Sequence, residues 1–314
     1  MSVRHLLKAS DLTKEEFLHV LELGKEFKAD PSKHSDALKQ KTLLMLFAKP
    51  SLRTRVSFET GMTMLGGHAI YYSVKDSPLG KKETIEDTAK VLSRMVDVVM
   101  ARLNLRKTMG DLAKHSTIPT INALDDFAHP CQMLADMMTI YEKRGSFDGL
   151  KMAFCGDCHN NVTYDLMRSA ALLGFEMRVA GPEGEEFEPE KEVLEECAEL
   201  CKVSGGKVIY THDAVEAVKD CEFVYADSWM SYHISPEEEA ERKTKFMPYQ
   251  ITRELLSHAA DNVKFMNCLP AMRGCEQTAD VIDDPKLSIV FDEAENRLWA
   301  QCGYLLFLKE QGML

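Results

Sequence analysis

Residues 42–67 read TLLMLFAKPSLRTRVSFETGMTMLGG, and this stretch decides the fold class. It begins with a short apolar run at residues 42–47, which predicts a buried strand. A loop with a proline and a serine follows, and a helical pattern then runs over residues 53–65. The pair Gly66 and Gly67 is typical of a helix end, because glycine tolerates the left-handed backbone found there. The order strand, loop, helix is the repeating unit of an α/β sheet.

The same alternation continues along the rest of the chain. Strands are predicted at residues 42–47, 69–74, 96–101, 119–122, 152–155, 176–180, 207–210, 222–226 and 264–267. Helices are predicted at about residues 11–27, 53–65, 84–95, 130–143, 162–173, 237–245 and 296–311. Further helices are predicted around Leu112, around Cys197 and Cys201, and between the strands at residues 207–210 and 222–226. The predicted fold class is therefore α/β, with two domains that are each an open, mostly parallel sheet flanked by helices. We expect the domains at residues 1–145 and 146–314, with the C-terminal helix packing back on the first domain.

Composition narrows the class of protein. A chain of 314 residues is long enough for two domains of about 150 residues, each with its own core. Its net charge of −12 disfavours nucleic acid and anionic membrane surfaces as partners, and no apolar run is long enough to predict a membrane span. Nine cysteines, an odd number in a long chain, predict buried thiols rather than a disulfide framework. We therefore expect a cytoplasmic protein without a signal peptide.

Polar residues follow the first predicted strands where an anion can bind. Ser51, Arg53 and Thr54 lie where the loop after the strand at residues 42–47 enters the next helix. Hydroxyls, main-chain N–H groups and guanidinium groups would converge there at a helix N-terminus, which suits a phosphate. Arg102 follows another predicted strand, so we expect it at the same edge of the sheet. The alternative is a capped helix with exposed arginines in ordinary ion pairs.

A second polar segment opens the helix predicted at residues 130–143. Pro130 fits the first helical turn, which places His129 at the entrance and Gln132 one turn further on. A histidine before a helix is, alternatively, often a cap or a surface residue.

In the second half, polar loops again follow predicted strands. The amides of Asn160 and Asn161 suit a carboxylate, Asp227 suits an ammonium group, and Ser231 offers a further hydrogen bond. Local turn formation is the alternative reading, because Asn and Asp are common in turns. Cys155 and Cys158 form a single Cys-x-x-Cys pair, which we do not expect to bind a metal or to act in redox chemistry.

Four segments in register resemble the aspartate/ornithine carbamoyltransferase family. Residues 51–55 (SLRTR) resemble its Ser-Thr-Arg-Thr-Arg motif, and residues 129–136 (HPCQMLAD) its His-Pro-x-Gln-x-Leu-Ala-Asp motif. Residues 267–270 (NCLP) resemble the His-Cys-Leu-Pro motif of the ornithine branch, and residues 295–297 (ENR) the Glu-Asn-Arg near the C-terminus. The resemblance covers nearly the whole chain. It implies transfer of a carbamoyl group from carbamoyl phosphate to ornithine, without a metal or an organic cofactor.

The resemblance also implies a carbamoyl phosphate site. Its residues would be Ser51, Leu52, Arg53, Thr54, Arg102, His129, Gln132, Cys268, Leu269 and Arg297. Those implied to take part in catalysis are Arg102, His129, Cys268 and Arg297. His129 and Gln132 would hold the carbamoyl carbonyl and amide, and Arg297 would reach the substrate from the side of the second domain.

The implied ornithine site consists of Asn161, Asp227, Ser231 and Tyr232. Asn161, Asp227 and Ser231 would hold the α-carboxylate and α-amino groups. Cys268 would lie beside Asp227 and orient substrate, with no covalent role. The attacking δ-amine must be neutral, and a desolvated site favours that form.

Two departures from the family pattern leave alternatives open. Asn267 stands where the family usually has histidine, and Tyr232-His233 replaces Met-Gly. The acceptor can therefore be another amine such as putrescine, or the chain can be a non-catalytic carbamoyl phosphate-binding protein. The resemblance further implies a homotrimer, in which the loop at residues 77–83, with Lys81 and Lys82, reaches the active site of a neighbouring subunit.

Overall fold

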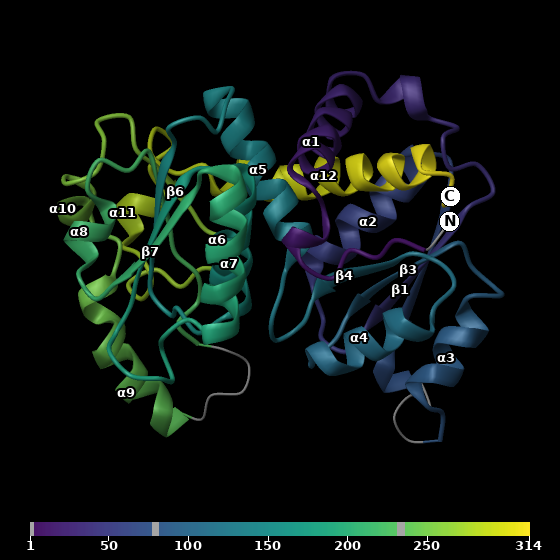
Figure 1. Ribbon diagram of the computed structural model, residues 1–314, viewed down its shortest axis with the longest axis horizontal. Helices are drawn as coiled ribbons and strands as arrows, with labels where there is room; N and C mark the ends of the chain where they lie inside the picture. The colour runs from purple at the N-terminus through teal and green to yellow at the C-terminus, as the bar shows by residue number, and fades with distance from the viewer. Residues whose placement is uncertain (1–2, 77–81, 231–235) are drawn as a thin grey trace. The chain divides into compact units, whose positions relative to one another are not determined.

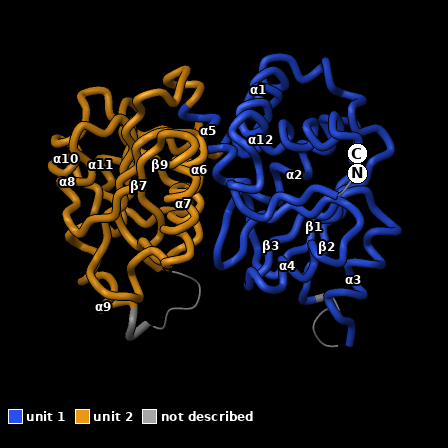
Figure 2. Tube along the Cα trace, viewed as in Figure 1, with its two compact units in different colours: residues 1–140, 295–314 blue, residues 141–294 orange. Residues whose placement is uncertain are grey.

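The structure is a computed structural model that describes residues 3–76, 82–230 and 236–314 (Figure 1). The chain forms two compact units, which Figure 2 shows in separate colours. Unit 1 comprises residues 1–140 and 295–314, and unit 2 comprises residues 141–294. Within the described ranges, no helix combines the length and the apolarity needed to cross a membrane.

Unit 1 is built on a parallel sheet with the strand order β2-β1-β3-β4. The strands are β1 (Thr42–Phe47), β2 (His68–Ser73), β3 (Val98–Arg102) and β4 (Thr120–Leu124). β3 is buried along its whole length, as expected for a central parallel strand covered on both faces. Phe47 and Arg102 are partners in the β1–β3 register, so the carboxyl ends of these two strands lie side by side.

Helices cover both faces of this sheet. They are α1 (Lys14–Ala29), α2 (Leu52–Met64), α3 (Ile85–Leu92), α4 (Arg106–His115), most of α5 (Pro130–Arg144) and most of α12 (Val290–Glu310), with short 3-10 turns at Ala9–Asp11, Pro31–His34 and Val74–Asp76. Figure 1 shows α3 and α4 on one face, and α1, α2 and α12 on the other. A Cβ at Gly303 of α12 would clash with the carbonyl oxygen of Val20 in α1, so glycine lets these two helices approach closely.

Unit 2 is built on a second parallel sheet, with the order β7-β6-β5-β8-β9. The strands are β5 (Lys151–Cys155), β6 (Glu176–Ala180), β7 (Lys207–Thr211), β8 (Phe223–Tyr225) and β9 (Lys264–Met266). The chain moves outward from β5 in one direction and returns to β8 on its other side. Such a reversal of strand order opens a crevice at the carboxyl ends of the two neighbouring strands, where open α/β sheets bind their ligands.

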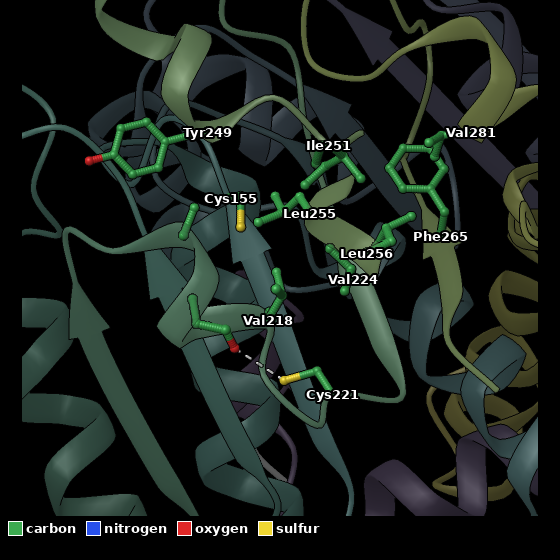
Figure 3. Close-up of a cluster of buried hydrophobic side chains, with 14 of the residues drawn as sticks. Cys155, Val218, Cys221, Val224, Tyr249, Ile251, Leu255, Leu256, Phe265 and Val281 are labelled. Carbon is green, nitrogen blue, oxygen red and sulfur yellow. Dashed lines mark hydrogen bonds between the residues drawn. The ribbon is translucent and has the colours of Figure 1, made fainter. Parts of the chain in front are cut away.

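The helices of unit 2 lie on both faces of its sheet. They are α6 (Asn161–Leu173), α7 (Lys191–Ser204), α8 (Ala214–Val218), α9 (Pro236–Phe246), α10 (Arg253–Leu256) and α11 (Ala279–Ile282), with a 3-10 turn at Met247–Tyr249. Between the sheet and α8, α10 and α11 lies a buried apolar cluster, drawn in Figure 3. Val224 and Phe265 contribute to it from the strands, and Val218, Leu255 and Val281 from the helices. This core fixes the strand ends that carry the polar loops described below.

The predicted fold class is confirmed, and each predicted strand overlaps one of β1–β9. The differences lie at element ends. Arg102, expected just after a strand, is the last residue of β3. The final helix begins at Val290 rather than near 296. The short α10 and α11 were not predicted, because four residues are too few to show helical periodicity.

Candidate active site

The entrance of α2 has the geometry of an anion-binding helix N-terminus. Ser51 is the N-cap, and its Oγ accepts a hydrogen bond from the main-chain N–H of Thr54 at 3.3 Å. The same hydroxyl donates to Thr54 Oγ1 at 3.1 Å. Thr54 is fully buried, whereas the Leu52 side chain is 75% exposed. Leu52 therefore faces solvent with its side chain, and its main-chain N–H belongs to the first turn of the helix.

Arg297 of α12 joins this helix entrance to α5. Its Nη2 donates to Thr54 Oγ1 at 3.2 Å, and its Nη1 donates to Gln132 Oε1 at 2.8 Å. Gln132 Nε2 in turn donates to Asp136 Oδ1 at 2.8 Å. These side chains are all buried. The expectation that Arg297 acts from the second domain's side is wrong, because α12 carries it into unit 1, where its hydrogen-bond partners lie.

His129 lies among three arginines. It is 5% exposed and directly precedes α5. Burial, followed by the charges on Arg297, Arg102 and Arg53, lowers the pKa of His129 well below its usual value. The imidazole is therefore neutral at pH 7 and has one N–H donor and one acceptor nitrogen.

A turn before α5 holds His129 in this position. Asp125 Oδ1 accepts from the N–H groups of Phe127 and Ala128, each at 2.8 Å, and Asp125 Oδ2 accepts from Asn122 Nδ2 at 2.9 Å. Sequence reasoning missed Asp125. The signal was present, because an aspartate that binds the N–H groups two and three residues later is a common turn device.

Lys49, in the loop after β1, is a second residue that the sequence analysis missed. Burial and the charge on Arg102 lower the pKa of Lys49. It lies two residues before the motif at residues 51–55 and is not part of it, so no motif singled it out. Together with the three arginines, it gives this part of unit 1 an excess of positive charge around hydroxyl donors and a neutral imidazole.

In unit 2, strand register brings Asp227 and Cys268 together. Tyr225 of β8 pairs with Met266 of β9, and the two site residues lie two positions beyond that pair on each strand. Cys268 Sγ donates to Asp227 Oδ1 at 3.1 Å. Because strands β8 and β9 are parallel neighbours, equal offsets from a paired position end at neighbouring side chains.

Asn267, which stands in place of the family's histidine, is buried and shapes the turn after β9. Its Oδ1 accepts from the N–H of Leu269 at 2.7 Å, and its Nδ2 donates to Gln277 Oε1 at 3.4 Å. Its own N–H donates to Glu293 Oε2 at 3.0 Å. The amide therefore fixes the main chain of Leu269, a residue of the implied carbamoyl phosphate site.

The loop after β5 carries the expected carboxylate-binding amides. Asn160 caps α6, since its Oδ1 accepts from the N–H of Thr163 at 2.9 Å, and Asn161 is the first residue of that helix. Asn160 thus has a structural role, and Asn161 lies at a helix N-terminus that favours an anion. Ser231 and Tyr232 lie outside the described residues.

The Cys-x-x-Cys pair is buried. Burial raises the pKa of both Cys155 and Cys158 above the usual thiol value, which makes them poor nucleophiles. Across residues 3–76, 82–230 and 236–314, no group of three or more His, Cys, Asp or Glu side chains is arranged to hold a metal ion.

Comparison with known proteins gives concordant matches over nearly the whole chain. Residues 4–142 match the family model described as aspartate/ornithine carbamoyltransferase, carbamoyl-P binding domain, and residues 148–308 match the one described as the Asp/Orn binding domain. An ornithine carbamoyltransferase of Pyrococcus horikoshii is 49% identical over 308 residues, which cover 97% of this chain and 95% of that protein.

Solved structures agree. The ornithine carbamoyltransferase from Pyrococcus furiosus is similar with a TM-score of 0.92 and 47% identity, covering 97% of this chain and 96% of that one. The ornithine transcarbamoylase from Giardia lamblia is similar with a TM-score of 0.90 and 45% identity, covering 98% of each chain. These matches confirm the resemblance found in the sequence motifs. The chain belongs to the aspartate/ornithine carbamoyltransferase family.

Proposed function

We propose that this chain is an ornithine carbamoyltransferase, which converts carbamoyl phosphate and L-ornithine into L-citrulline and phosphate. The observation that carries the proposal is the network in which Arg297 binds Thr54 and Gln132 beside a neutral His129. The relatives described above are named for ornithine, which favours it over putrescine and favours an enzyme over a protein that only binds carbamoyl phosphate.

Carbamoyl phosphate would bind in unit 1. Ser51, Thr54 and the main-chain N–H of Leu52 offer donors to the phosphate oxygens at the N-terminus of α2, and the charges of Arg53 and Arg102 add to them. Phosphate is the leaving group of the reaction, so these donors stabilise the negative charge that develops as the C–O bond breaks.

The carbamoyl group would be held by His129, Gln132 and Arg297. The N–H of the neutral imidazole can donate to the carbamoyl carbonyl oxygen, and the guanidinium of Arg297 can add a second donor. An amide oxygen has two lone pairs, so Gln132 Oε1 can accept from the carbamoyl NH₂ as well as from Arg297. Each donor that holds the developing oxyanion is worth roughly 2.7–4 kcal/mol by analogy with other oxyanion sites.

Ornithine would bind in unit 2. Asp227 suits its α-ammonium group, and Asn161 suits its α-carboxylate, with Ser231 and Tyr232 as further expected contacts outside the described residues. The main-chain carbonyls of Cys268 and Leu269 would accept N–H groups of the δ-amine and of the carbamoyl group. The neutral δ-amine attacks the carbonyl carbon, a C–N bond forms, phosphate leaves, and the amine releases a proton.

We also propose a cytoplasmic homotrimer. None of the nine cysteines, all of which lie within the described residues, forms a disulfide, which fits a reducing compartment. Apolar side chains are exposed on α2 and on the edge strand β2, namely Leu52, Val56, Ile70 and Tyr72, which favours a protein partner on this part of unit 1.

The loop at residues 77–83, expected to reach a neighbouring subunit, lies mostly outside the described residues. Mixing subunits with Arg53→Ala and subunits without Lys81 and Lys82 should restore activity if sites are shared; no recovery would contradict this.

The decisive test is carbamoyl transfer from carbamoyl phosphate to ornithine, which gives citrulline, compared with transfer to putrescine, which gives N-carbamoylputrescine. We expect citrulline, released phosphate in equal amount, and little product from putrescine. Preference for putrescine would refute the acceptor assignment, and carbamoyl phosphate binding without any carbamoylated product would refute the enzymatic one.

A further inference from the structure

The loop after β8 is anchored by Trp229, two residues beyond Asp227. The Trp229 side chain is fully buried, and its ring stacks on Phe246 of α9 with the centroids 5.7 Å apart. A Cβ at Gly156, in the loop after β5, would lie 3.2 Å from Trp229 Nε1, so glycine at that position leaves room for the indole. The side chain of Trp229 therefore packs against the loop that leads to Asn161.

The main chain of Trp229 is held from two sides. Its N–H donates to Glu276 Oε1 at 3.3 Å, and its carbonyl oxygen accepts from Arg242 Nε at 3.0 Å. Glu276 is fully buried, and its second oxygen accepts from the N–H of Met272, in the segment after β9. Burial and the nearby charge of Asp227 raise the pKa of Glu276. The main chain at Trp229 is thus bound both to α9, through Arg242, and to the segment after β9, through Glu276.

Arg242 extends this connection to the loop after β5. Its Nη2 donates to Asp157, which is 4% exposed and accepts a hydrogen bond from the N–H of His159. The guanidinium also lies over the rings of Phe187 and Phe246, at 5.4 and 5.0 Å. Burial raises the pKa of Asp157 to about 6, although Arg242 acts in the opposite direction. Arg242 is therefore the cation that makes a buried carboxylate tolerable in this position.

We propose that Arg242 is a positioning residue for the amino-acid substrate: by joining Asp157 to the carbonyl of Trp229, it holds the Asn161 and Asp227 loops in fixed relation. This inference rests on the proposed function, because it assumes that these two loops bind the α-carboxylate and α-ammonium groups of ornithine. A small amino acid with two charged ends is recognised by the distance between its two binding groups. The guanidinium sets that distance without contacting the substrate.

The chemistry of arginine is essential to this role. A planar guanidinium donates in two directions at once, here through Nε to a carbonyl and through Nη2 to a carboxylate. A lysine at position 242 keeps the charge opposite Asp157 but has a single ammonium at its end. It would preserve the ion pair and lose the simultaneous bond to Trp229.

The test compares steady-state kinetics of Arg242→Gln, Arg242→Lys and Asp157→Asn with the wild type. We expect Arg242→Gln to raise KM for ornithine at least tenfold, which corresponds to about 1.4 kcal/mol. KM for carbamoyl phosphate should stay within about twofold and kcat within about threefold. Arg242→Lys should give an intermediate KM for ornithine. Asp157→Asn should resemble Arg242→Gln, and the double variant should be no worse than either, because both break one connection.

Arg178→Gln is the matched control. Arg178 also belongs to unit 2, pairs with Glu176, and donates to the main-chain carbonyls of Glu216 and Lys219, and none of these three partners belongs to the loops after β5, β8 or β9. The Arg178→Gln variant should lower the melting temperature about as much as Arg242→Gln does, and it should leave KM for ornithine unchanged. The proposal is overturned if Arg242→Gln raises both KM values alike, if lysine is no better than glutamine, or if the control reproduces the effect. If one of these results is found while the wild type forms citrulline, only the role of Arg242 is refuted and the proposed function is unaffected. If the wild type forms no citrulline, the proposed function itself is refuted.

Discussion

Asp125 offers a sharp test of how the fold holds His129. The change is Asp125→Asn, which alters one atom of a side chain that is 3% exposed. The amide oxygen of asparagine can still accept from the N–H groups of Phe127 and Ala128. The amide nitrogen would then face Asn122 Nδ2, where a carboxylate oxygen now accepts at 2.9 Å.

The size of the effect follows from these contacts. Asn122 is fully buried and already donates to the carbonyl of Leu7 at 2.8 Å, so it cannot rotate its amide without losing that bond. One buried N–H is left without an acceptor, which costs about 1–3 kcal/mol. Rotating the newly introduced amide instead would break two bonds, at a greater cost. We therefore expect the free energy of unfolding to fall by about 1–3 kcal/mol.

The assay has two parts and a neighbouring control. Urea denaturation gives the stability change, and kcat/KM for carbamoyl phosphate reports whether His129 keeps its position. We expect this kcat/KM to fall about tenfold or more, because small displacements of catalytic groups are costly. The control is Asp126→Asn, the next residue, which is exposed and accepts from the N–H of Arg106 at 2.6 Å. Equal effects of the two variants, or full activity in Asp125→Asn, would refute the assigned role of the turn.

Three further predictions concern the two substrate sites, the pKa of His129 and the packing of α1 against α12. Arg53→Ala should raise KM for carbamoyl phosphate strongly, and Asp227→Ala should mainly raise KM for ornithine; equal loss of both substrates in both variants would argue against separate sites. Folding lowers the pKa of His129, so the unfolded chain binds more protons below pH 6.5, and stability should fall with decreasing pH by up to about 1.4 kcal/mol per pH unit. His129→Gln should weaken that dependence in urea titrations at pH 7 and pH 5, and an unchanged dependence would contradict it. Gly303→Ala should lower the melting temperature, because its Cβ would meet the carbonyl of Val20; an unchanged melting temperature would show that α1 and α12 separate easily.

How much of the fold and the site the sequence could predict depended on how far apart the interacting residues lie along the chain. Ser51 and Thr54 form a local cap, so their motif and their geometry agree. Asp227 and Cys268 are 41 positions apart, and only the family resemblance placed them together before the strand register supplied the physical reason.

The residues that were missed have distant partners or common local patterns. Arg242 is 85 positions from Asp157, and Glu276 is 47 from Trp229, so no motif could connect either pair. Asp125 was missed although its partners are two and three residues away, because Asp in a turn is common. The side from which Arg297 acts was wrong because it was carried over from the family resemblance, whereas packing places its helix in the first unit, as expected for the C-terminal helix.

That helix has a consequence for biosynthesis. The core of unit 1 includes residues such as Leu305 and Leu308, which are fully buried, yet they are translated after the whole of unit 2. At about 5–20 residues per second, on the order of ten seconds separate Ile140 from Glu295 on the ribosome. During that interval the amino-terminal half exposes the apolar surface that α12 will cover, while the later half can already complete its sheet. The unit whose synthesis begins first therefore completes its core only when the last residues of the chain are made, and until then its apolar surface is accessible to a chaperone.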